Sequence, residues 1–528
     1  MKYNPYLDQG EYHLPTKISM NKLRERFLYP VLMDRRYTFL FFFSLAFFAR
    51  VVAWTNIPVD WNGDSFVHWQ IAYLTLKIGI KHFRMWDLNG LEYYWGMVPH
   101  LVEALILGFF RTSSLFPYRL FNMIIGSINA YLVYLIGRDN FYWEVGFYSA
   151  LFVAFFPVFM VFDITALQDT LALFFLLLGF YYYRVKPFNA GIMFALTCQS
   201  RIEYWLVCVI FIFTIPLFER PRRRFVAVLF GWLLVMVPFI WIFWTHTGNP
   251  FYPLWLSLSN IFSDGIPGAV PENIWKTIII WASSKLNRLL HDPLYFAAAL
   301  PVFASLLSVI YLAFRPQKKY YIYSLFIATM LVNGFYTINY VGTRWFWIIS
   351  RILMSTIALG VILLMYWLDS TPLKRFNIQN ILLIAVILSE FVIFPNFQIY
   401  QKYTLEAHRI ADTAMEYYDG GTIVCDYQTM NYRFINKWHI KPANIMSNQY
   451  SPLYYGSQDP QEFISWFIHY NITLWIDDDW SQSQAMLRYL NRYLPQLLIF
   501  RESIDYVYLA WIDGIDIYTV NTTFLEIP

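Results

Sequence analysis

The sequence predicts a polytopic α-helical membrane protein with a small α/β domain at its C-terminal end. Hydrophobic residues fill 58% of the 528 positions and charged residues only 14%, and the mean hydropathy is +0.41. A soluble protein of this length carries more charge, because its surface must be hydrated. Aromatic residues make up 21% of the chain, and tryptophan and tyrosine favour bilayer interfaces. The three cysteines have no paired spacing, so the sequence predicts neither a disulfide framework nor a redox motif.

The first membrane element follows a polar, basic segment, residues 1–36, that lacks the pattern of a signal peptide. We therefore expect residues 37–56 to be a retained span, in which Arg50 snorkels toward the interface. Residues 58–117 form a long loop with two helices, near 66–80 and 92–111, that are expected to lie along the interface. Further apolar runs bring the total to about eleven spans. These runs are 118–137, 145–162, 169–184, 188–200, 203–218, 225–246, 293–314, 320–337, 346–368 and 378–398.

Charge asymmetry predicts the orientation of these spans. Alternate loops carry the tight basic clusters, namely Arg138, then Arg184 and Lys186, then Arg220 with Arg222, Arg223 and Arg224, then Arg315, Lys318 and Lys319, then Lys374 and Arg375. Basic loops stay on the cytoplasmic side of a membrane. The sequence thus predicts a multi-pass protein of the cytoplasmic membrane, with a cytoplasmic N-terminal segment (1–36), a membrane domain (37–398) and an extracytoplasmic domain (399–528). The loop 58–117 is then the first outer loop.

The C-terminal segment, residues 399–528, is more polar and has a mixed pattern. Strand-like runs are expected at 422–425, 472–476, 506–511 and 515–520, and helical runs near 402–417, 460–470 and 481–493. Alternation of this kind favours a small α/β domain. The run Asp477-Asp478-Asp479 is interpreted as a solvated strand end, and the run Arg222-Arg223-Arg224 as a topology signal, not a nucleic-acid patch.

Polar and ionisable side chains gather at the outer ends of the predicted spans, where such groups are functional candidates. Asp60, Asp64 and His68 are spaced i, i+4, i+8, which predicts one helical face. The whole set is Asp60, Asp64, His68, Glu92, Gln168, Asp169, Arg201, Glu203, His246, Asn249, Tyr252, Arg344 and Arg351. Arginine grips phosphate through a planar fork, and a carboxylate can take a proton from a hydroxyl nucleophile. We therefore expect one outward-facing cavity for an anionic, lipid-linked ligand.

Four stretches together resemble the GT-C superfamily of polyprenyl-phosphate-sugar-dependent glycosyltransferases, which includes protein O-mannosyltransferases and the lipid A aminoarabinose transferase. They are Gly63-Asp64-Ser65, the helix from Tyr94-Trp95 to His100, the span from Tyr118-Arg119 to Arg138, and the run 157–184 around Asp169. The resemblance covers residues 37–260 best. Ser65 stands where the family often has a second acid, and Leu91-Glu92-Tyr93 stands where bacterial members have Lys-Pro-Pro.

This resemblance implies that Asp64 is the catalytic base, that Asp169 lines the site and that Arg201 lies near the donor phosphate. Asp60 is a second candidate acid, and Arg344 and Arg351 are further candidates for the phosphate. A hydroxyl acceptor on a glycan, lipid or protein would attack the sugar of a polyprenyl (dolichyl or undecaprenyl) phosphate donor and invert the anomeric carbon. The remaining candidates, His68, Glu92, Gln168, Glu203, His246, Asn249 and Tyr252, would line the substrates.

Two other classes of protein remain open at this point. A secondary transporter is one, although the sequence shows no inverted repeat and no pair of broken helices in matching halves. A non-catalytic, lipid-binding subunit of the same fold is the other, because Ser65 replaces the second acid. The sequence names no cofactor and no metal ligand set, and a divalent metal stays an open alternative. Partners are expected to be membrane lipids and the two glycosyl substrates, with no nucleic acid.

Overall fold

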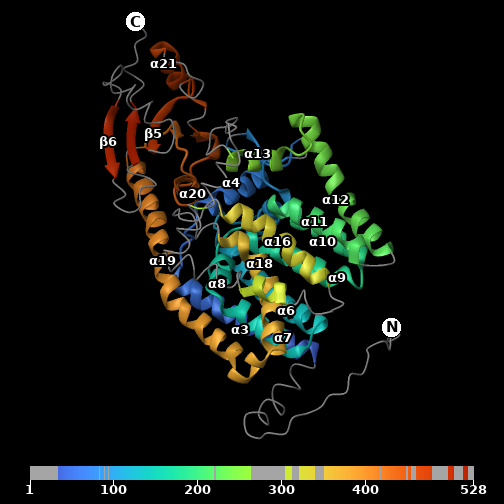
Figure 1. Cartoon of the computed structure of the whole chain (residues 1–528). Coiled ribbons are helices and arrows are strands. Elements are labelled where there is room, and N and C mark those ends of the chain that lie inside the picture. Colours follow the sequence, from blue (N-terminus) through green and yellow to red (C-terminus); the bar gives the residue numbers. More distant parts are fainter. Residues whose placement is uncertain are drawn as a thin grey trace.

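The computed structural model describes residues 34–81, 84–88, 90–92, 94–218, 222–262, 283, 304–311, 320–338, 350–416, 418–447, 450–452, 459–478, 498–504 and 515–520. Arg344, the helix expected near 481–493 and the strand expected at 506–511 lie outside these ranges, as does most of the span expected at 293–314. The described chain is a bundle of helices with a small sheet at one end (Figure 1).

Within the described residues, four segments are long and apolar enough to cross a membrane. They are α3 (Arg35–Asn56), α6 (Phe116–Asn140), α12 (Arg223–Thr247) and residues 351–370, which join η2 (Ser350–Leu353) to α18 (Met354–Ser370). Shorter or interrupted helices complete the bundle: α9 (Asp169–Tyr183), α10 (Pro187–Ser200), α11 (Glu203–Phe218) and α16 (Tyr320–Ile338). These helices confirm the predicted fold class, a polytopic helical membrane protein.

The span expected at 145–162 is broken into α7 (Trp143–Phe155) and α8 (Pro157–Asp163), which meet at 57°. Phe156 between them is extended, with φ −71° and ψ 123°. A residue before proline is pushed out of the helical region, and proline has no N–H to continue the helix. Counted as one broken span, the pair is a fifth candidate crossing among the described residues.

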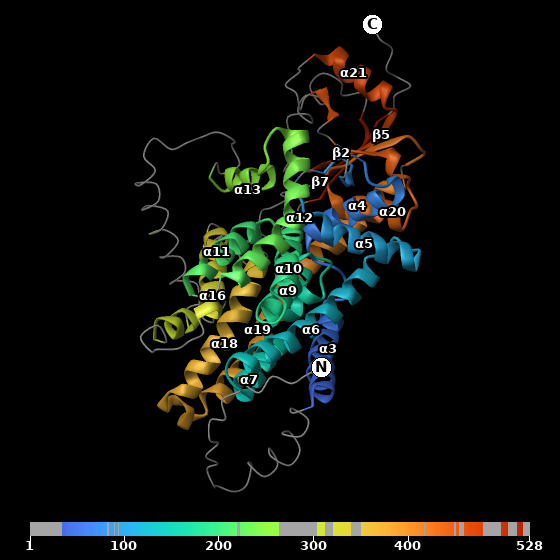
Figure 2. The same cartoon turned by 90° about the vertical axis from the view of Figure 1, so that its right-hand side faces the viewer.

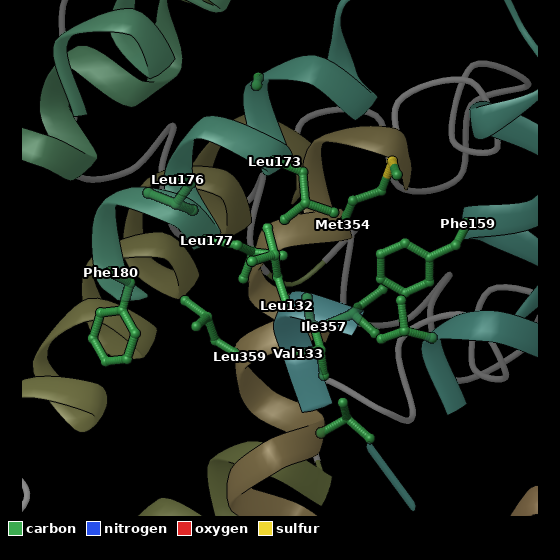
Figure 3. Close-up of a cluster of buried hydrophobic side chains, with 14 of the residues drawn as sticks. Leu132, Val133, Phe159, Leu173, Leu176, Leu177, Phe180, Met354, Ile357 and Leu359 are labelled. Atoms are coloured by element: carbon green, nitrogen blue, oxygen red, sulfur yellow. The ribbon is translucent and has the colours of Figure 1, made fainter. Parts of the chain in front are cut away.

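A buried apolar cluster holds the bundle together (Figure 3). It joins α6, α8, α9 and α18 through side chains that are almost fully buried, including Val133, Phe159, Leu173, Leu177 and Ile357. Burying a side chain of this size is worth about 1.5–3 kcal/mol. The ends of α9 and α18 that carry polar residues are therefore fixed relative to each other.

Arg50 does not snorkel to the interface, which corrects the prediction. Its side chain is fully buried, and Nη2 lies 2.7 Å from Oδ2 of Asp163. Nη1 donates to the carbonyl oxygens of Ala154 at 2.9 Å and Ala46 at 3.0 Å. Thr170 donates to the other carboxylate oxygen of Asp163 at 2.7 Å. An ionised group inside the bilayer is tolerated when it is paired and hydrogen-bonded in this way.

The first loop holds two helices, α4 (Gly63–Ile78) and α5 (Met97–Phe110), with a short hairpin of β1 (Trp86–Asp87) and β2 (Gly90–Leu91) between them. The Asn62 side chain caps α4 by accepting from the N–H of Asp64 at 2.9 Å. Asp60 precedes this cap. The prediction of one helical face is therefore wrong for Asp60 and correct only for the spacing of Asp64 and His68.

The C-terminal part begins on a continuous helix, α19 (Ile378–Met415), so position 398 falls inside a helix. Five strands follow: β3 (Thr422–Val424), β4 (Ile445–Met446), β5 (Ile472–Asp478), β6 (Leu498–Ile504) and β7 (Ile515–Val520). Their order is β4-β3-β5-β7-β6; β3 pairs in parallel with β4 and β5, and β7 pairs antiparallel with β5 and β6. With α20 (Gln428–Asn436) and α21 (Pro460–His469), this sheet forms the small α/β unit that the sequence predicts.

The α/β unit sits on the first loop, where α20 lies beside α4 (Figure 2). A second apolar cluster joins Phe66 and Trp69 of α4 to Ile410 of α19 and Phe434 of α20. The Ser113 hydroxyl adds a hydrogen bond to Oδ1 of Asn436 at 2.7 Å. Thus the loop that carries Asp64 is held between the helical bundle and the α/β unit.

Candidate active site

Five charged side chains from four separate stretches of the sequence form one chain of ion pairs. Arg351 donates from Nη2 to Oδ2 of Asp64 at 2.5 Å, and its Nε lies 3.7 Å from Oδ2 of Asp169. Asp169 also pairs with Arg201. Arg201 in turn donates to both carboxylate oxygens of Glu203, at 2.7 and 3.1 Å. The order is Asp64, Arg351, Asp169, Arg201, Glu203.

Each member of this chain stands where a helix begins or ends. Asp64 is in the first turn of α4, Asp169 opens α9 and Glu203 opens α11. Acidic residues at helix N-termini are favoured by the exposed N–H groups and the helix dipole. Arg201 occupies the extended residue after α10, and Arg351 lies in the 3₁₀ turn before α18. Local helix signals therefore place the carboxylates, and tertiary packing brings the arginines to them.

The chain is buried at one end and open at the other. The side chains of Arg351, Asp169 and Arg201 are no more than 5% exposed, whereas that of Asp64 is 43% exposed. Three carboxylates and two guanidinium groups give the chain a net charge of −1. Within the described residues, Nε and Nη1 of Arg351 are buried without a hydrogen-bond partner. Strong donors in this condition normally find an acceptor, so Arg351 is equipped to hold a further oxyanion.

Gln168, next to Asp169 in the sequence, adds an uncharged hydrogen-bond donor and acceptor. Its side chain is buried, and neither its amide oxygen nor its amide nitrogen has a partner among the described residues. A buried amide that makes no hydrogen bond costs free energy. Gln168 therefore lies next to the buried end of the ion-pair chain, and its substrate-lining role stays a prediction.

Two histidines meet behind Asp64. Nδ1 of His68 lies 2.9 Å from Nε2 of His100, and Nδ1 of His100 lies 2.8 Å from the carbonyl oxygen of Gly96. Burial lowers the pKa of His68 well below its usual value, and the positive charges of Arg351 and Arg201 lower it further. The sequence singled out His68 but not its partner; His100 stands within the quoted Tyr94–His100 motif, and only the fold pairs the two.

Asp60 is fully committed to the architecture of the loop. Oδ2 accepts from the N–H of Ala166 at 2.8 Å, Oδ1 accepts from the N–H of Asn62 at 3.2 Å, and Nε of Arg119 lies 3.9 Å away. Burial raises the pKa of the Asp60 carboxyl group, an effect that Arg119 opposes. The carboxylate joins the start of α4 to the turn before α9, and its described contacts do not include the ion-pair chain.

Glu92 is likewise used inside the loop. Its Oε1 accepts from the backbone N–H groups of Tyr94 and Trp95, and its carbonyl oxygen accepts from Nε of Arg84 at 2.5 Å. Arg84 also donates to the carbonyl oxygen of Trp95 at 3.2 Å and lies 4.8 Å from the ring centre of Phe243 in α12. Arg84 therefore fixes the Trp95 segment to α12, a role that the sequence did not indicate.

His246, Asn249 and Tyr252 lie at the turn between α12 and α13 (Tyr252–Phe262). Oδ1 of Asn249 accepts from the N–H of Phe251 at 2.9 Å, which is a local turn contact. In Figure 2, α13 stands on the opposite side of α12 from α4. The substrate-lining role of these three residues stays a prediction.

No cluster of three or more His, Cys, Asp or Glu side chains in the described ranges is arranged to hold a metal ion. The three carboxylates of the ion-pair chain face arginines.

Fold and site together define a helical membrane protein with a buried carboxylate–arginine network next to its first loop. No protein-family model and no curated protein sequence matches the chain. The solved structures to which it is similar include those of two groups of proteins.

The first group is the oligosaccharyltransferase AglB of Archaeoglobus fulgidus. A structure in complex with an inhibitory peptide and a dolichol-phosphate has a TM-score of 0.47 at 12% identity, covering 92% of this chain and 75% of that one. A complex with Zn and sulfate scores 0.49 at 12% identity, covering 89% and 72%. The second group is ArnT of Cupriavidus metallidurans. The structure bound to undecaprenyl phosphate has a TM-score of 0.41 at 12% identity and covers 91% of this chain and 97% of that one.

Proposed function

We propose that this protein is a membrane glycosyltransferase that moves a sugar from a polyprenyl phosphate to a hydroxyl group of an acceptor. The observation that carries the proposal is the Asp64–Arg351 pair. A half-exposed carboxylate meets a buried guanidinium group, in which Nε and Nη1 make no hydrogen bond within the described chain and Nε lies 3.7 Å from Asp169. A base at the open end and an oxyanion holder at the buried end are the two groups that such a transfer requires.

Arg351 is the residue proposed to hold the donor phosphate, with Arg201 behind it. Guanidinium groups bind phosphate oxygens through paired N–H bonds, and these bonds are strong where water is excluded. Asp169 lies between the two arginines and keeps both oriented. An arriving phosphate competes with Asp64 for Arg351. Donor binding therefore releases the Asp64 carboxylate at the moment when a base is needed.

The proposed reaction is a direct displacement. The Asp64 carboxylate takes the proton of the acceptor hydroxyl, and that oxygen forms a bond to the anomeric carbon of the sugar. The bond between the anomeric carbon and the phosphate oxygen breaks, and its electron pair leaves with the polyprenyl phosphate. The transition state has oxocarbenium character. Arg351 and Arg201 stabilise the charge on the departing phosphate, and the anomeric configuration is inverted.

The proposed setting is the outer face of the cytoplasmic membrane. The positive-inside pattern supports this orientation, since it puts the first loop and the α/β unit on the side opposite the basic clusters. The α/β unit covers the loop that carries Asp64, and a glycan, lipid or protein acceptor would approach beside it.

The test is transfer of labelled sugar in native membranes. A panel of polyprenyl phosphates that carry a hexose or a pentose is offered to the wild type, to Asp64→Asn and to Asp139→Asn, at matched expression. Asp139 is the matched control because its side chain is 40% exposed, compared with 43% for Asp64, and it also pairs with an arginine, Arg138. Loss of a general base typically costs a factor of about 10²–10⁴ in rate.

Transfer by wild type and Asp139→Asn, with at least a hundredfold loss in Asp64→Asn, is the expected result. Equal transfer by all three proteins would remove Asp64 as the base. An absence of transfer with every donor, together with release of no free polyprenyl phosphate, would contradict the enzyme and leave the lipid-binding subunit or the transporter. Retention of the anomeric configuration in the product would contradict a single displacement.

A further inference from the structure

The His68–His100 pair lies in the site but has no part in the proton transfer proposed for Asp64. Both side chains are almost fully buried, and they come from different helices of the loop, α4 and α5. The Trp95 ring packs edge-on against His68, with ring centres 4.8 Å apart. Two neutral imidazole groups buried at this cost, with a hydrogen bond between them, need a reason beyond filling space.

The hydrogen bonds decide which nitrogens carry protons. The carbonyl oxygen of Gly96 can only accept, so Nδ1 of His100 bears a hydrogen and donates to it. In a neutral ring, Nε2 of His100 is then the acceptor, and the hydrogen between the rings belongs to Nδ1 of His68. Nε2 of His68 is left with a lone pair. This atom is buried and has no partner among the described residues.

The ring of His68 is close to the charged groups of the proposed reaction. His68 is one helical turn after Asp64 on α4, a rise of about 6 Å along the same face. The charges of Arg351 and Arg201 both act on its ring. In an in-line displacement, the sugar lies between the attacking hydroxyl and the departing phosphate. In the proposed reaction, a side chain that is one turn from the base and near the arginines is positioned to contact the sugar.

We propose that Nε2 of His68 accepts a hydrogen bond from a hydroxyl group of the donor sugar, and that His100 holds His68 in the tautomer that makes this possible. The proposal rests on the glycosyl-transfer function proposed above and adds the residue that recognises the sugar. A neutral acceptor suits this task, because the neighbouring arginines supply only donors and would be occupied by phosphate. His68 is the sugar-contacting residue and His100 its positioning residue.

The test separates recognition of the sugar from recognition of the lipid phosphate. Purified protein in detergent is titrated with bare polyprenyl phosphate and with the same lipid carrying a sugar, and binding is followed by the rise in melting temperature. We compare wild type, His68→Phe, His68→Gln and the exposed control His469→Phe. We expect His68→Phe to bind the sugar-bearing lipid about 10-fold to 100-fold more weakly than wild type does. Its affinity for the bare lipid should stay within about twofold of that of wild type.

Conservative replacement and substrate analogues sharpen the result. His68→Gln keeps an acceptor oxygen near the position of Nε2 and is expected to recover part of the loss. Donor analogues that each lack one sugar hydroxyl are then compared with the complete donor. One of them should bind wild type about 10-fold to 100-fold more weakly than the complete donor, while His68→Phe should show little difference in affinity between the two. An equal loss for both lipids in His68→Phe would overturn the proposal, as would unchanged binding of the sugar-bearing lipid.

The two proposals fail in different ways. Selective binding of a sugar-bearing lipid that depends on His68, without any transfer, would contradict the glycosyltransferase and keep the assignment of His68. Transfer that occurs with normal kcat/KM in His68→Phe would keep the enzyme and overturn the assignment. Wild-type protein that binds no sugar-bearing lipid from the panel would overturn the role of His68.

Discussion

Removing one of the two cations of the ion-pair chain, in the variant Arg201→Met, is the perturbation with the best-defined cost. Arg201 pairs with Asp169 and donates twice to Glu203, at 2.7 and 3.1 Å, while only 5% of its side chain is exposed. Methionine fills much of the same volume but carries no charge. Asp169 keeps a weaker pairing with Arg351 at 3.7 Å, whereas Glu203 loses both hydrogen bonds from Arg201.

The cost follows from these contacts. Breaking a buried ion pair by removing one partner destabilises by about 3–5 kcal/mol, because a charge is left buried and uncompensated. The variant Glu203→Gln should cost about 1–2 kcal/mol, since Arg201 keeps Asp169 and loses charge-assisted bonds only. In the double variant the orphaned charge is gone. Its total cost should therefore be about 2–3 kcal/mol, less than that of Arg201→Met alone.

The assay is thermal unfolding of detergent-solubilised protein, followed by tryptophan fluorescence at one scan rate. Arg201→Met should lower the melting temperature by roughly 3–8 °C, and the double variant should melt above it. Arg138→Met is the control, because its pair with Asp139 is partly exposed and such pairs contribute about 0–1 kcal/mol. A double variant that melts at the temperature expected from adding the two single shifts would refute the reasoning.

Two further predictions concern the loop and the α/β unit. Burial and the charge of Arg433 lower the pKa of His408 to about 4. In the unfolded chain this pKa is near 6.5, so the unfolded state binds the proton more tightly. The free energy of unfolding therefore falls by about 2 kcal/mol as the pH drops from about 6.5 to 4. Melting of His408→Phe should be less sensitive to pH across this window, and parallel curves for variant and wild type would contradict the assignment. A Cβ on Gly96 would lie 1.8 Å from the carbonyl oxygen of Gln199, so Gly96→Ala should destabilise by about 1–3 kcal/mol and impair transfer. The control is Gly63→Ala, where a Cβ meets nothing within 4 Å, and equal melting of the two variants would count against this close approach.

Much of the helical order was predictable because the helix starts carry strong local signals. The helices α9, α10 and α11 begin at Asp169, Pro187 and Glu203, within one residue of the predicted positions, since acidic residues and proline favour the first helical turn. The break at Phe156 was missed because a long apolar run outweighed the proline that follows. Helix α20 and strand β4 were missed because they are short and their pattern is weak.

The site was predictable as a region but not as a set of contacts. Counting polar residues at one interface singled out Asp64, Asp169, Arg201, Glu203 and Arg351, and the structure joins all five. Asp64 and Arg351 are 287 positions apart, and no spacing rule connects residues so distant. The burial of Arg50 was missed for the same reason, because the sequence does not reveal that its partner, Asp163, lies buried on another helix.

Helix α19 sets the rotation and the distance of the α/β unit relative to the membrane part. Its 38 residues, which include Pro395, run from the contacts with α7 and α8 to the contacts with α20, a length along the helix of roughly 57 Å. One residue inserted near position 398 would turn everything beyond it by about 100° and lift it by about 1.5 Å. The contact surfaces of α20 and α4 would then no longer face each other. The length of α19 therefore determines how the α/β unit is oriented on the first loop.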